Sequence, residues 1–387
     1  MAEYDPFEEM GLTLDKQLVC NCHGLISRND SLRGLCTRYI RNGDRFYDTV
    51  SRYDDLTAHL LGRNDSQAGN VSKFAAPFLK AFGATDHDVY GFFKEDLALM
   101  PGAATAVRYV YGLLPTFLAT TSYEHHMMNV CDAIDFPMGN VSCTKVEFDS
   151  CEIRRQEAKE LRDMAAEITA LRIPKTEYSP HTPMEMDPGD VNIVSVLDRI
   201  LADRLPRMDA GDIVNSVSTM GEDEKAYSLL EIRRKTEIDL DSTACIGGDS
   251  TDYRALDLVR DSNGLAMSFN GTESAVRGCN VAVMAKDSTV AAVLVQEFYN
   301  EGIEAVYDLI SCWDRATLRE KDCPDRHLMD AMLSANPRRL PEVFIVDRDN
   351  VDEISSKSGE YRRRVLRPQG YGGPPSRDGA GGRTAVF

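Results

Sequence analysis

The chain has 387 residues, of which 43% are hydrophobic, and its formal net charge is −18. This length suits one large domain with an insertion, or two domains, and it allows a substantial core to be buried. A surface this acidic repels the phosphates of nucleic acids and of anionic lipids, so we expect no nucleic-acid partner. Solubility is the simplest role for such acidity.

The ten cysteines are scattered along the chain, and the only close pair is Cys20 and Cys22. This spacing fits neither a zinc site nor an iron–sulfur site, and a disulfide framework is not expected without an export signal. Residues 1–15 lack the pattern of a signal peptide, and no apolar stretch reaches the roughly 18 residues that span a membrane. We therefore expect free thiols, a cytoplasmic protein and no direct membrane insertion.

The first half of the chain alternates between predicted strands and helices. An apolar run at 17–20 is typical of a buried parallel strand, and it ends in a glycine turn at 21–24. The segment 28–99 carries apolar residues at helical spacing, so it is predicted to be mostly helical. A helix over 103–113 then leads into a second strand over 116–119.

Hydroxyl side chains follow the second predicted strand at Thr120 and Thr121. At the carboxyl end of a parallel strand they are well placed to donate hydrogen bonds to an anion, but one of them can equally cap the next helix. A less regular stretch follows. Residues 151–171 and 191–205 are predicted helices, separated by a proline-rich loop over 173–189.

The second half begins with a helix near Met220, which is acidic in its first turn as the helix dipole favours. Strands are predicted over 244–247, 265–269, 281–284 and 342–346, and one long helix is predicted over 287–309. The segment 355–387 is rich in Gly, Arg and Pro and is expected to be a disordered tail.

The alternation predicts an α/β fold, a Rossmann-like parallel sheet with helices on both faces, in which ligands bind outside the carboxyl ends of the strands. The predicted divisions are an extension at 1–16, a core at 17–27 and 100–354 with a helical insertion at about 151–215, a helical cap at 28–99, and the tail at 355–387.

Four polar groups follow predicted strands or open a helix, in the order Asn21 and His23, Thr120 and Thr121, Lys225, Asp249 and Asp252. This order resembles the motifs of the haloacid-dehalogenase superfamily. Those motifs are Asp-x-Asp-Gly after a strand, Ser or Thr after a second strand, a lone Lys, and Gly-Asp with a further Asp. The chain also resembles, more specifically, an archaeal branch of predicted phosphatases, some of which are assigned as subunit R of energy-converting hydrogenase A. The stretches that carry this resemblance are 51–56, 120–123, 145–149, 221–226, 247–253 and 268–271.

The resemblance implies a phosphohydrolase site closed by the cap at 28–99. In such a site an aspartate attacks phosphorus, a second aspartate moves the proton, Lys and a hydroxyl hold the phosphoryl oxygens, and Mg²⁺ binds the carboxylates. By this match Thr120, Thr121 and Lys225 would hold phosphate, and Asp249 and Asp252 would bind the metal.

The first motif departs from this pattern. With Gly24 as anchor, Asn21 takes the nucleophile position and His23 the acid/base position. An amide is neither a nucleophile nor an anionic ligand, although His23 can still move a proton near neutral pH. The fourth motif is one residue out of register: if Asp252 is aligned, Gly248 takes the slot of the first aspartate and Asp249 lies beside it. Strong Mg²⁺ binding is therefore not expected, whereas an anion pocket can persist.

Two other sets of residues carry alternative chemistry. A thiolate at Cys20 or Cys22 could attack beside His23, but small buried residues packing next to the sheet are the commoner case. The pair His125 and His126 suggests a metal site, but adjacent helical residues do not face one ligand, so a surface pair is expected.

Three hypotheses follow. The first is a non-catalytic or regulatory subunit in archaeal energy metabolism, with a complex of the energy-converting hydrogenase type as its partner. The second is an altered phosphohydrolase of a small phosphorylated metabolite that uses His23, Asp249 and Asp252 with a water nucleophile. The third is a module that senses a phosphorylated small molecule through Thr120, Thr121 and Lys225. The departures at Asn21 and His23 favour the first, so we do not expect an active enzyme.

Overall fold

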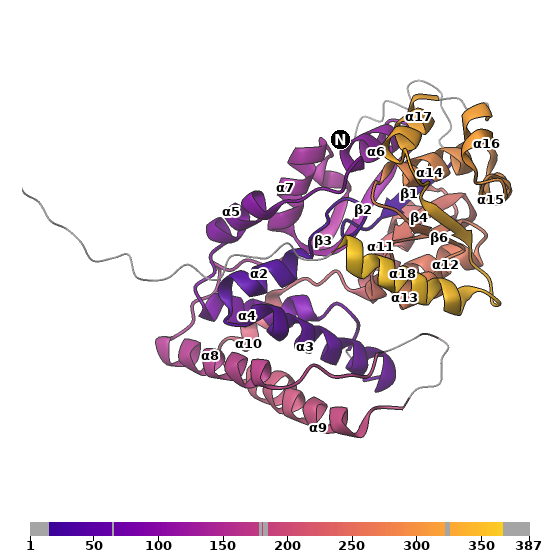
Figure 1. Ribbon diagram of the computed structural model, residues 1–387. Coiled ribbons are helices and arrows are strands. Elements are labelled where there is room, and N and C mark those ends of the chain that lie inside the picture. The colour runs from indigo at the N-terminus through magenta and orange to yellow at the C-terminus, as the bar shows by residue number, and fades with distance from the viewer. Residues whose placement is uncertain (1–14, 64–65, 178–179, 181–184, 322–325, 367–387) are drawn as a thin grey trace, which may run out of the picture.

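The computed structural model describes residues 15–63, 66–177, 180, 185–321 and 326–366. These residues form a sheet flanked by helices and, beside it, a separate group of helices (Figure 1). No helix in these described ranges has the length and apolarity needed to cross a membrane.

One sheet organises the core, with the strand order β3-β2-β1-β4-β5-β6-β7. All neighbouring strands from β3 to β6 pair in parallel, and β7 is antiparallel to β6. The strands are β1 (Gln17–Cys20), β2 (Thr116–Tyr123), β3 (Val141–Thr144), β4 (Thr243–Gly247), β5 (Leu265–Phe269), β6 (Val281–Met284) and β7 (Glu342–Ile345). The antiparallel edge strand was not foreseen, but the α/β class with a mostly parallel sheet is confirmed.

Helices cover both faces of the sheet because successive strand residues point to opposite sides. Leu18 and Cys20 belong to one apolar cluster, and Val19 belongs to another. The first cluster includes side chains from α6 (Ala103–Tyr111), α7 (Glu124–Ile134), α14 (Thr289–Glu301), α15 (Ile303–Ser311), α16 (Arg315–Glu320) and α17 (Arg326–Ala335). The second includes side chains from α11 (Glu222–Thr236), α12 (Tyr253–Asp261), α13 (Glu273–Gly278) and α18 (Val351–Val365).

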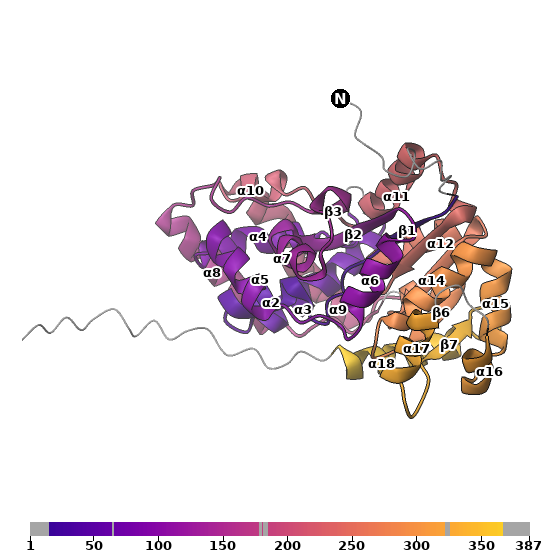
Figure 2. The same ribbon diagram turned by 90° about the horizontal axis from the view of Figure 1, so that it is seen from above.

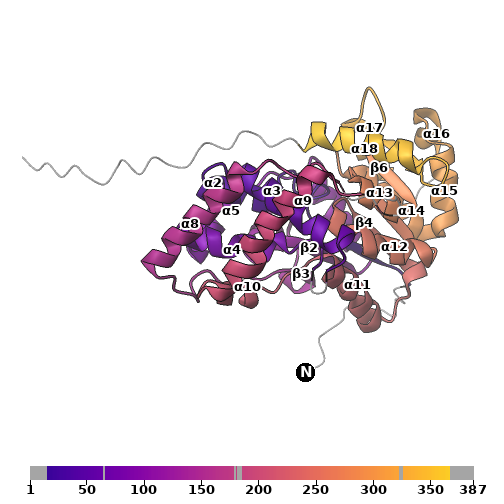
Figure 3. The same ribbon diagram turned by 90° about the horizontal axis from the view of Figure 1, so that it is seen from below.

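The remaining α-helices form a second packed unit, which we call the helical unit. Its members share one apolar cluster and come from two stretches of the chain. They are α2 (Ser31–Tyr39), α3 (Gly43–Asp55), α4 (Val71–Ala81) and α5 (Asp86–Asp96), with α8 (Arg155–Ala170), α9 (Pro188–Leu197) and α10 (Gly211–Ser216). π-helical turns at Leu56–Leu60 and Asp198–Arg204 extend α3 and α9. A helical region after β1 was predicted. The predicted insertion at 151–215 packs onto this region, on one side of the sheet (Figures 1 and 3).

Two predicted elements differ in detail. The expected single helix over 287–309 is two helices, α14 and α15, because the chain turns sharply at Gly302, whose φ of +86° suits glycine. β3 lies in a stretch for which the sequence indicated no regular structure. Its four residues are too few to show a clear alternation.

The tail predicted from 355 is wrong at its start, because α18 runs through it to Val365. Ile354, Ser358 and Val365 are buried, while acidic residues in the first turn and arginines in the last suit the helix dipole. This polar helix owes its order to packing on the core, which composition does not reveal. Residues 367–387, like 1–14, lie outside the described residues.

Candidate functional site

The predicted site residues gather where β1, β2 and β4 end. β1 pairs in parallel with β2 on one side and with β4 on the other, so their carboxyl ends open on the same edge of the sheet. Asn21 and His23 follow β1, and Asp249 and Asp252 follow β4. α11 supplies Lys225. The structure thus brings three of the four predicted groups into direct contact.

Asn21 lies at the centre of this contact and is 3% exposed. Its Nδ2 donates hydrogen bonds to Oδ2 of Asp249 and to Oδ2 of Asp252, both at 2.9 Å. Its Oδ1 accepts from the backbone N–H of Cys22 at 2.7 Å. Both polar atoms of its side chain are therefore used within the protein, and a donor stands between two carboxylates.

Both carboxylates of the fourth motif, Asp249 and Asp252, reach Asn21. Asp252 accepts at Oδ2 from the backbone N–H groups of Gly248 (2.7 Å) and Asp249 (2.8 Å) as well as from Asn21. A Cβ on Gly247 would come within 2.4 Å of the Asp252 Cβ, so only glycine lets Asp252 turn back over the end of β4.

Lys225 is 2% exposed, and its Nζ donates to Asp252 Oδ1 at 2.7 Å and to Thr251 Oγ1 at 2.9 Å. The ammonium charge is therefore already compensated by a buried carboxylate. A buried ion pair of this kind is held in place because removing either partner leaves an uncompensated charge.

Arg362 of α18 completes the cluster, although it was not predicted as a site residue. Its guanidinium forms an ion pair with Asp249 and donates to the carbonyls of Gly248 at 3.1 Å and Asn270 at 3.0 Å. The C-terminal end of α18 reaches the side of the core that faces the helical unit (Figures 2 and 3). The only signal in the sequence was the apolar spacing of Ile354 and Val365, which would have placed a helix there.

His23 and Arg362 together determine the charge state of Asp249. The Nδ1 of His23 lies 3.2 Å from the carboxylate. Burial alone would raise the pKa of Asp249, but His23 and Arg362 beside it hold that pKa well below its usual value. Asp249 is therefore an anion with a built-in cationic partner.

A cavity of about 240 Å³ opens between this cluster and the helical unit. From the core it is lined by His23, Thr121 and Asp249, among others, and from the helical unit by Asp30 and Asp55. Most of the other lining residues carry hydroxyl groups. Burial raises the pKa of Asp55 to about 6. The cavity is thus polar and acidic rather than cationic.

Of the three residues predicted to hold phosphate, only Thr121 lines the cavity. Both threonines lie within β2, which continues to Tyr123 rather than ending at 119. Thr121 lines the cavity, whereas Thr120 is fully buried beside Ser122, with 3.4 Å between their hydroxyl oxygens. Neither Thr120 nor Lys225 lines the cavity.

The cluster does not fit Mg²⁺. Such an ion needs carboxylate oxygens free to coordinate it. Here Asn21, Lys225 and Arg362 donate to those oxygens, and the described residues contain no group of three or more His, Cys, Asp or Glu that could hold a metal.

The alternative nucleophiles are poorly placed. Cys20 and Cys22 are buried, and burial raises the pKa of both thiols far above the usual value for cysteine.

The two adjacent histidines lie in different surroundings. His125 contacts Asp86 at 3.0 Å. The expectation of a surface histidine pair is wrong for His126, which packs against Phe93 and whose pKa is lowered to about 3 by burial.

No family model matches the chain, and no curated protein matches it in sequence. Its structure is similar to that of gene product AF1437 from Archaeoglobus fulgidus, with 22% identity, a TM-score of 0.73, and coverage of 91% of this chain and 97% of the other. Two phosphoserine phosphatase structures match more distantly. The phospho-aspartyl intermediate analogue has 9% identity, covers 73% of this chain and 98% of its own, and has a TM-score of 0.40. The substrate-bound complex has 9% identity, covers 73% and 97%, and has a TM-score of 0.41. These two likenesses are too distant to support an inference. What the comparisons show is that this chain shares the fold of the archaeal gene product along most of its length.

Proposed function

We propose that this chain is a haloacid-dehalogenase-like protein that has lost phosphohydrolase chemistry and serves as a non-catalytic, regulatory subunit. The observation that carries the proposal is the set of contacts made by Asn21. By the resemblance, Asn21 takes the nucleophile position of that fold, and its amide donates to both Asp249 and Asp252 at 2.9 Å. An amide in this position cannot form an aspartyl-phosphate, and its N–H groups compete with a cation for the same oxygens.

Internal cations support the same conclusion. Lys225 neutralises Asp252 and Arg362 neutralises Asp249, so the charge that a divalent ion would offset is already offset by side chains. Breaking either pair to admit a metal would leave a buried cation without its partner. The cluster therefore acts as a structural brace that joins β1, β4, α11 and α18.

The other two hypotheses find less support. An altered phosphohydrolase needs a metal or a free acid near a water, yet Asp249 and Asp252 are both committed to donors within the protein. Anion sensing through Lys225 is opposed by its pairing with Asp252, and the carboxylates of Asp30 and Asp55 in the cavity would repel a phosphate.

The regulatory role is proposed from the resemblance to the archaeal branch, in which some members are assigned to energy-converting hydrogenase. We therefore propose a complex of that type as the partner of this chain. A chain without chemistry of its own is more simply explained by what it assembles with than by a substrate.

Hydrolysis of p-nitrophenyl phosphate and acetyl phosphate with Mg²⁺ tests the loss of chemistry. Wild type should show no turnover above background, and Asn21→Asp with His23→Asp should gain turnover if the remaining geometry is intact. Asp252→Asn is the matched control. Metal-dependent turnover in wild type that disappears in Asp252→Asn would overturn the proposal.

A further inference from the structure

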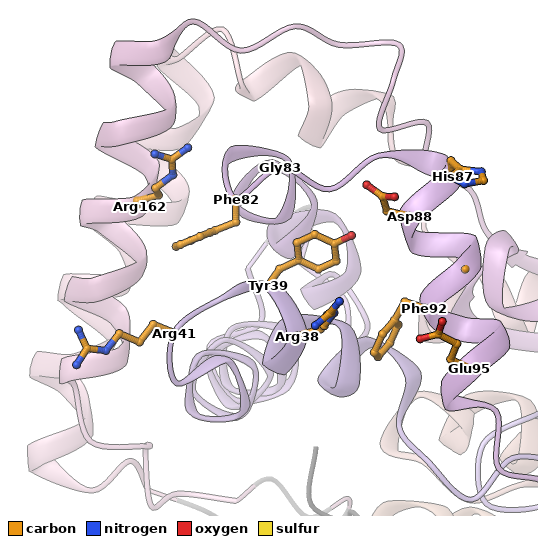
Figure 4. A pocket seen from close by; sticks show the side chains of 11 residues that line it. Arg38, Tyr39, Arg41, Phe82, Gly83, His87, Asp88, Phe92, Glu95 and Arg162 are labelled. Atoms are coloured by element: carbon orange, nitrogen blue, oxygen red, sulfur yellow. The ribbon is translucent and has the colours of Figure 1, made fainter. Parts of the chain in front are cut away.

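A second and larger pocket lies in the helical unit, apart from the cluster around Asn21. Its volume is about 710 Å³, within the range of small-molecule sites. It is bounded by the end of α2, the turn after α4, the length of α5 and the middle of α8 (Figure 4). It shares no lining residue with the cavity of about 240 Å³ that opens between the cluster and the helical unit.

Two arginines form one wall of this pocket. Figure 4 shows Arg162 on α8 and Arg41 just beyond α2 on the same side, whereas Arg38 lies away from them, beside Phe92. Arg162 is held in place, because it donates through Nε (2.9 Å) and Nη2 (2.6 Å) to the carbonyl of Ala81, and its guanidinium lies 5.8 Å from the ring centre of Phe82. Its Nη1 has no partner among the described residues.

Arg38 and Arg41 have neither a hydrogen bond nor an ion pair to any residue that the structure describes. The chain has 62 acidic residues against 44 Lys and Arg, and most of its described arginines pair with a carboxylate or a carbonyl. A guanidinium without such a partner, as on Arg41, attracts an external anion, and Arg162 can offer the same anion its Nη1.

The opposite wall and the floor have different chemistry. Asp88 and Glu95 lie along α5, across the pocket from Arg41 and Arg162, and the rings of Tyr39, Phe82 and Phe92 lie between the two walls (Figure 4). The pocket is therefore polarised, with anion-binding groups at one end, aromatic faces in the middle and hydrogen-bond acceptors at the other. A separate hollow of about 300 Å³ continues from its basic end past Arg41 and Arg162.

We propose that this pocket binds a phosphorylated nucleoside. The phosphate contacts Arg41 and Arg162, the planar base lies against the aromatic rings, and the amino or hydroxyl groups of the ligand donate to Asp88 and Glu95. Each part of the ligand meets a wall of matching chemistry, since bases stack on aromatic faces and charge-assisted bonds favour phosphate on arginine. A bare phosphate lacks the stacking, and a neutral nucleoside lacks the anion.

Calorimetric titration of the full chain tests the proposal, with adenosine monophosphate, adenosine and inorganic phosphate as probes. Adenosine monophosphate should bind about tenfold or more tightly than either of the other two, because only it engages both ends of the pocket. Arg41→Met should weaken its binding by about tenfold without loss of stability, because Arg41 has no bond to lose.

Arg45→Met is the matched control. Arg45 is exposed on the same unit, donates to the carbonyl of Leu171 and does not line the pocket, so its replacement should leave the affinity unchanged. The absence of adenosine monophosphate binding, or equal affinities in wild type and Arg41→Met, would overturn the proposal. So would binding of a single-stranded RNA oligomer without binding of the mononucleotide.

Discussion

Replacement of Asn21 by Asp removes the hydrogen-bond donor at the centre of the cluster and adds a third negative charge there. Asn21 Nδ2 lies 2.9 Å from oxygens of both Asp249 and Asp252. The substitution keeps the shape of the side chain but turns the shared donor into an acceptor. Two hydrogen bonds become two contacts between like charges.

The cost follows from the geometry. Hydrogen bonds to charged groups contribute about 1.5–3 kcal/mol each, and two unit charges about 4 Å apart repel by about 4 kcal/mol at an effective dielectric constant of about 20. Lys225 and Arg362 offset part of this repulsion, and uptake of a proton by one carboxyl caps it. We therefore expect Asn21→Asp to lower the free energy of unfolding at pH 7 by about 3–5 kcal/mol.

Urea unfolding of Asn21→Asp and of the matched variant Asn21→Leu measures this. Leu removes the same hydrogen bonds without adding charge, so it should be the less destabilised of the two. Millimolar Mg²⁺ should restore stability to Asn21→Asp alone, and at pH 5 the two variants should converge as the new carboxyl is protonated. Equal stabilities at pH 7, or an equal response of wild type to Mg²⁺, would show that Asn21 is not the donor that keeps the two carboxylates together.

Three further predictions concern the cluster and its surroundings. Burial raises the pKa of Glu222 from 4.5 to about 8, so the stability contributed by its neutral form is complete below pH 4.5 and is lost as pH rises through 8. Glu222→Gln should therefore gain about 4 kcal/mol relative to wild type between pH 5 and pH 9, and a pH-independent difference in urea unfolding would count against this assignment. Arg362→Ala should cost about 1–3 kcal/mol in the same assay, whereas Arg363→Ala, exposed one residue further along α18, should stay within about 0.5 kcal/mol. Gly69 has a φ of +105°, and a Cβ there would lie 2.8 Å from backbone at the start of α11. Gly69→Ala should thus lower the melting temperature by several degrees more than Gly62→Ala, where φ is +53° but the space is open; equal shifts would exclude the packing argument.

Much of the core could be predicted because its strands are short apolar runs bounded by turns. β1, β5 and β6 begin and end at the predicted residues. The order of polar groups after β1 and β4 was likewise enough to place Asn21, Asp249 and Asp252 at one edge of the sheet.

What could not be predicted depends on contacts between distant parts of the chain. Arg362 reaches Asp249 across 113 positions, and nothing in the local pattern of either residue indicates the pair. The pairing of Lys225 with Asp252, in place of a position facing an open pocket, depends on side-chain geometry that the sequence does not show. It was also not predicted that 28–99 and 151–215 pack together in one helical unit. The sequence of an amphipathic helix shows that it has an apolar face, but not which element covers that face.

The carboxylates of Asp249 and Asp252 are held by the protein's own donors and cations. Calorimetric titration of Mg²⁺ into the wild-type chain at neutral pH should therefore give no saturable heat. A saturable binding curve in wild type that disappears in Asp252→Asn would show instead that these carboxylates are open to a metal.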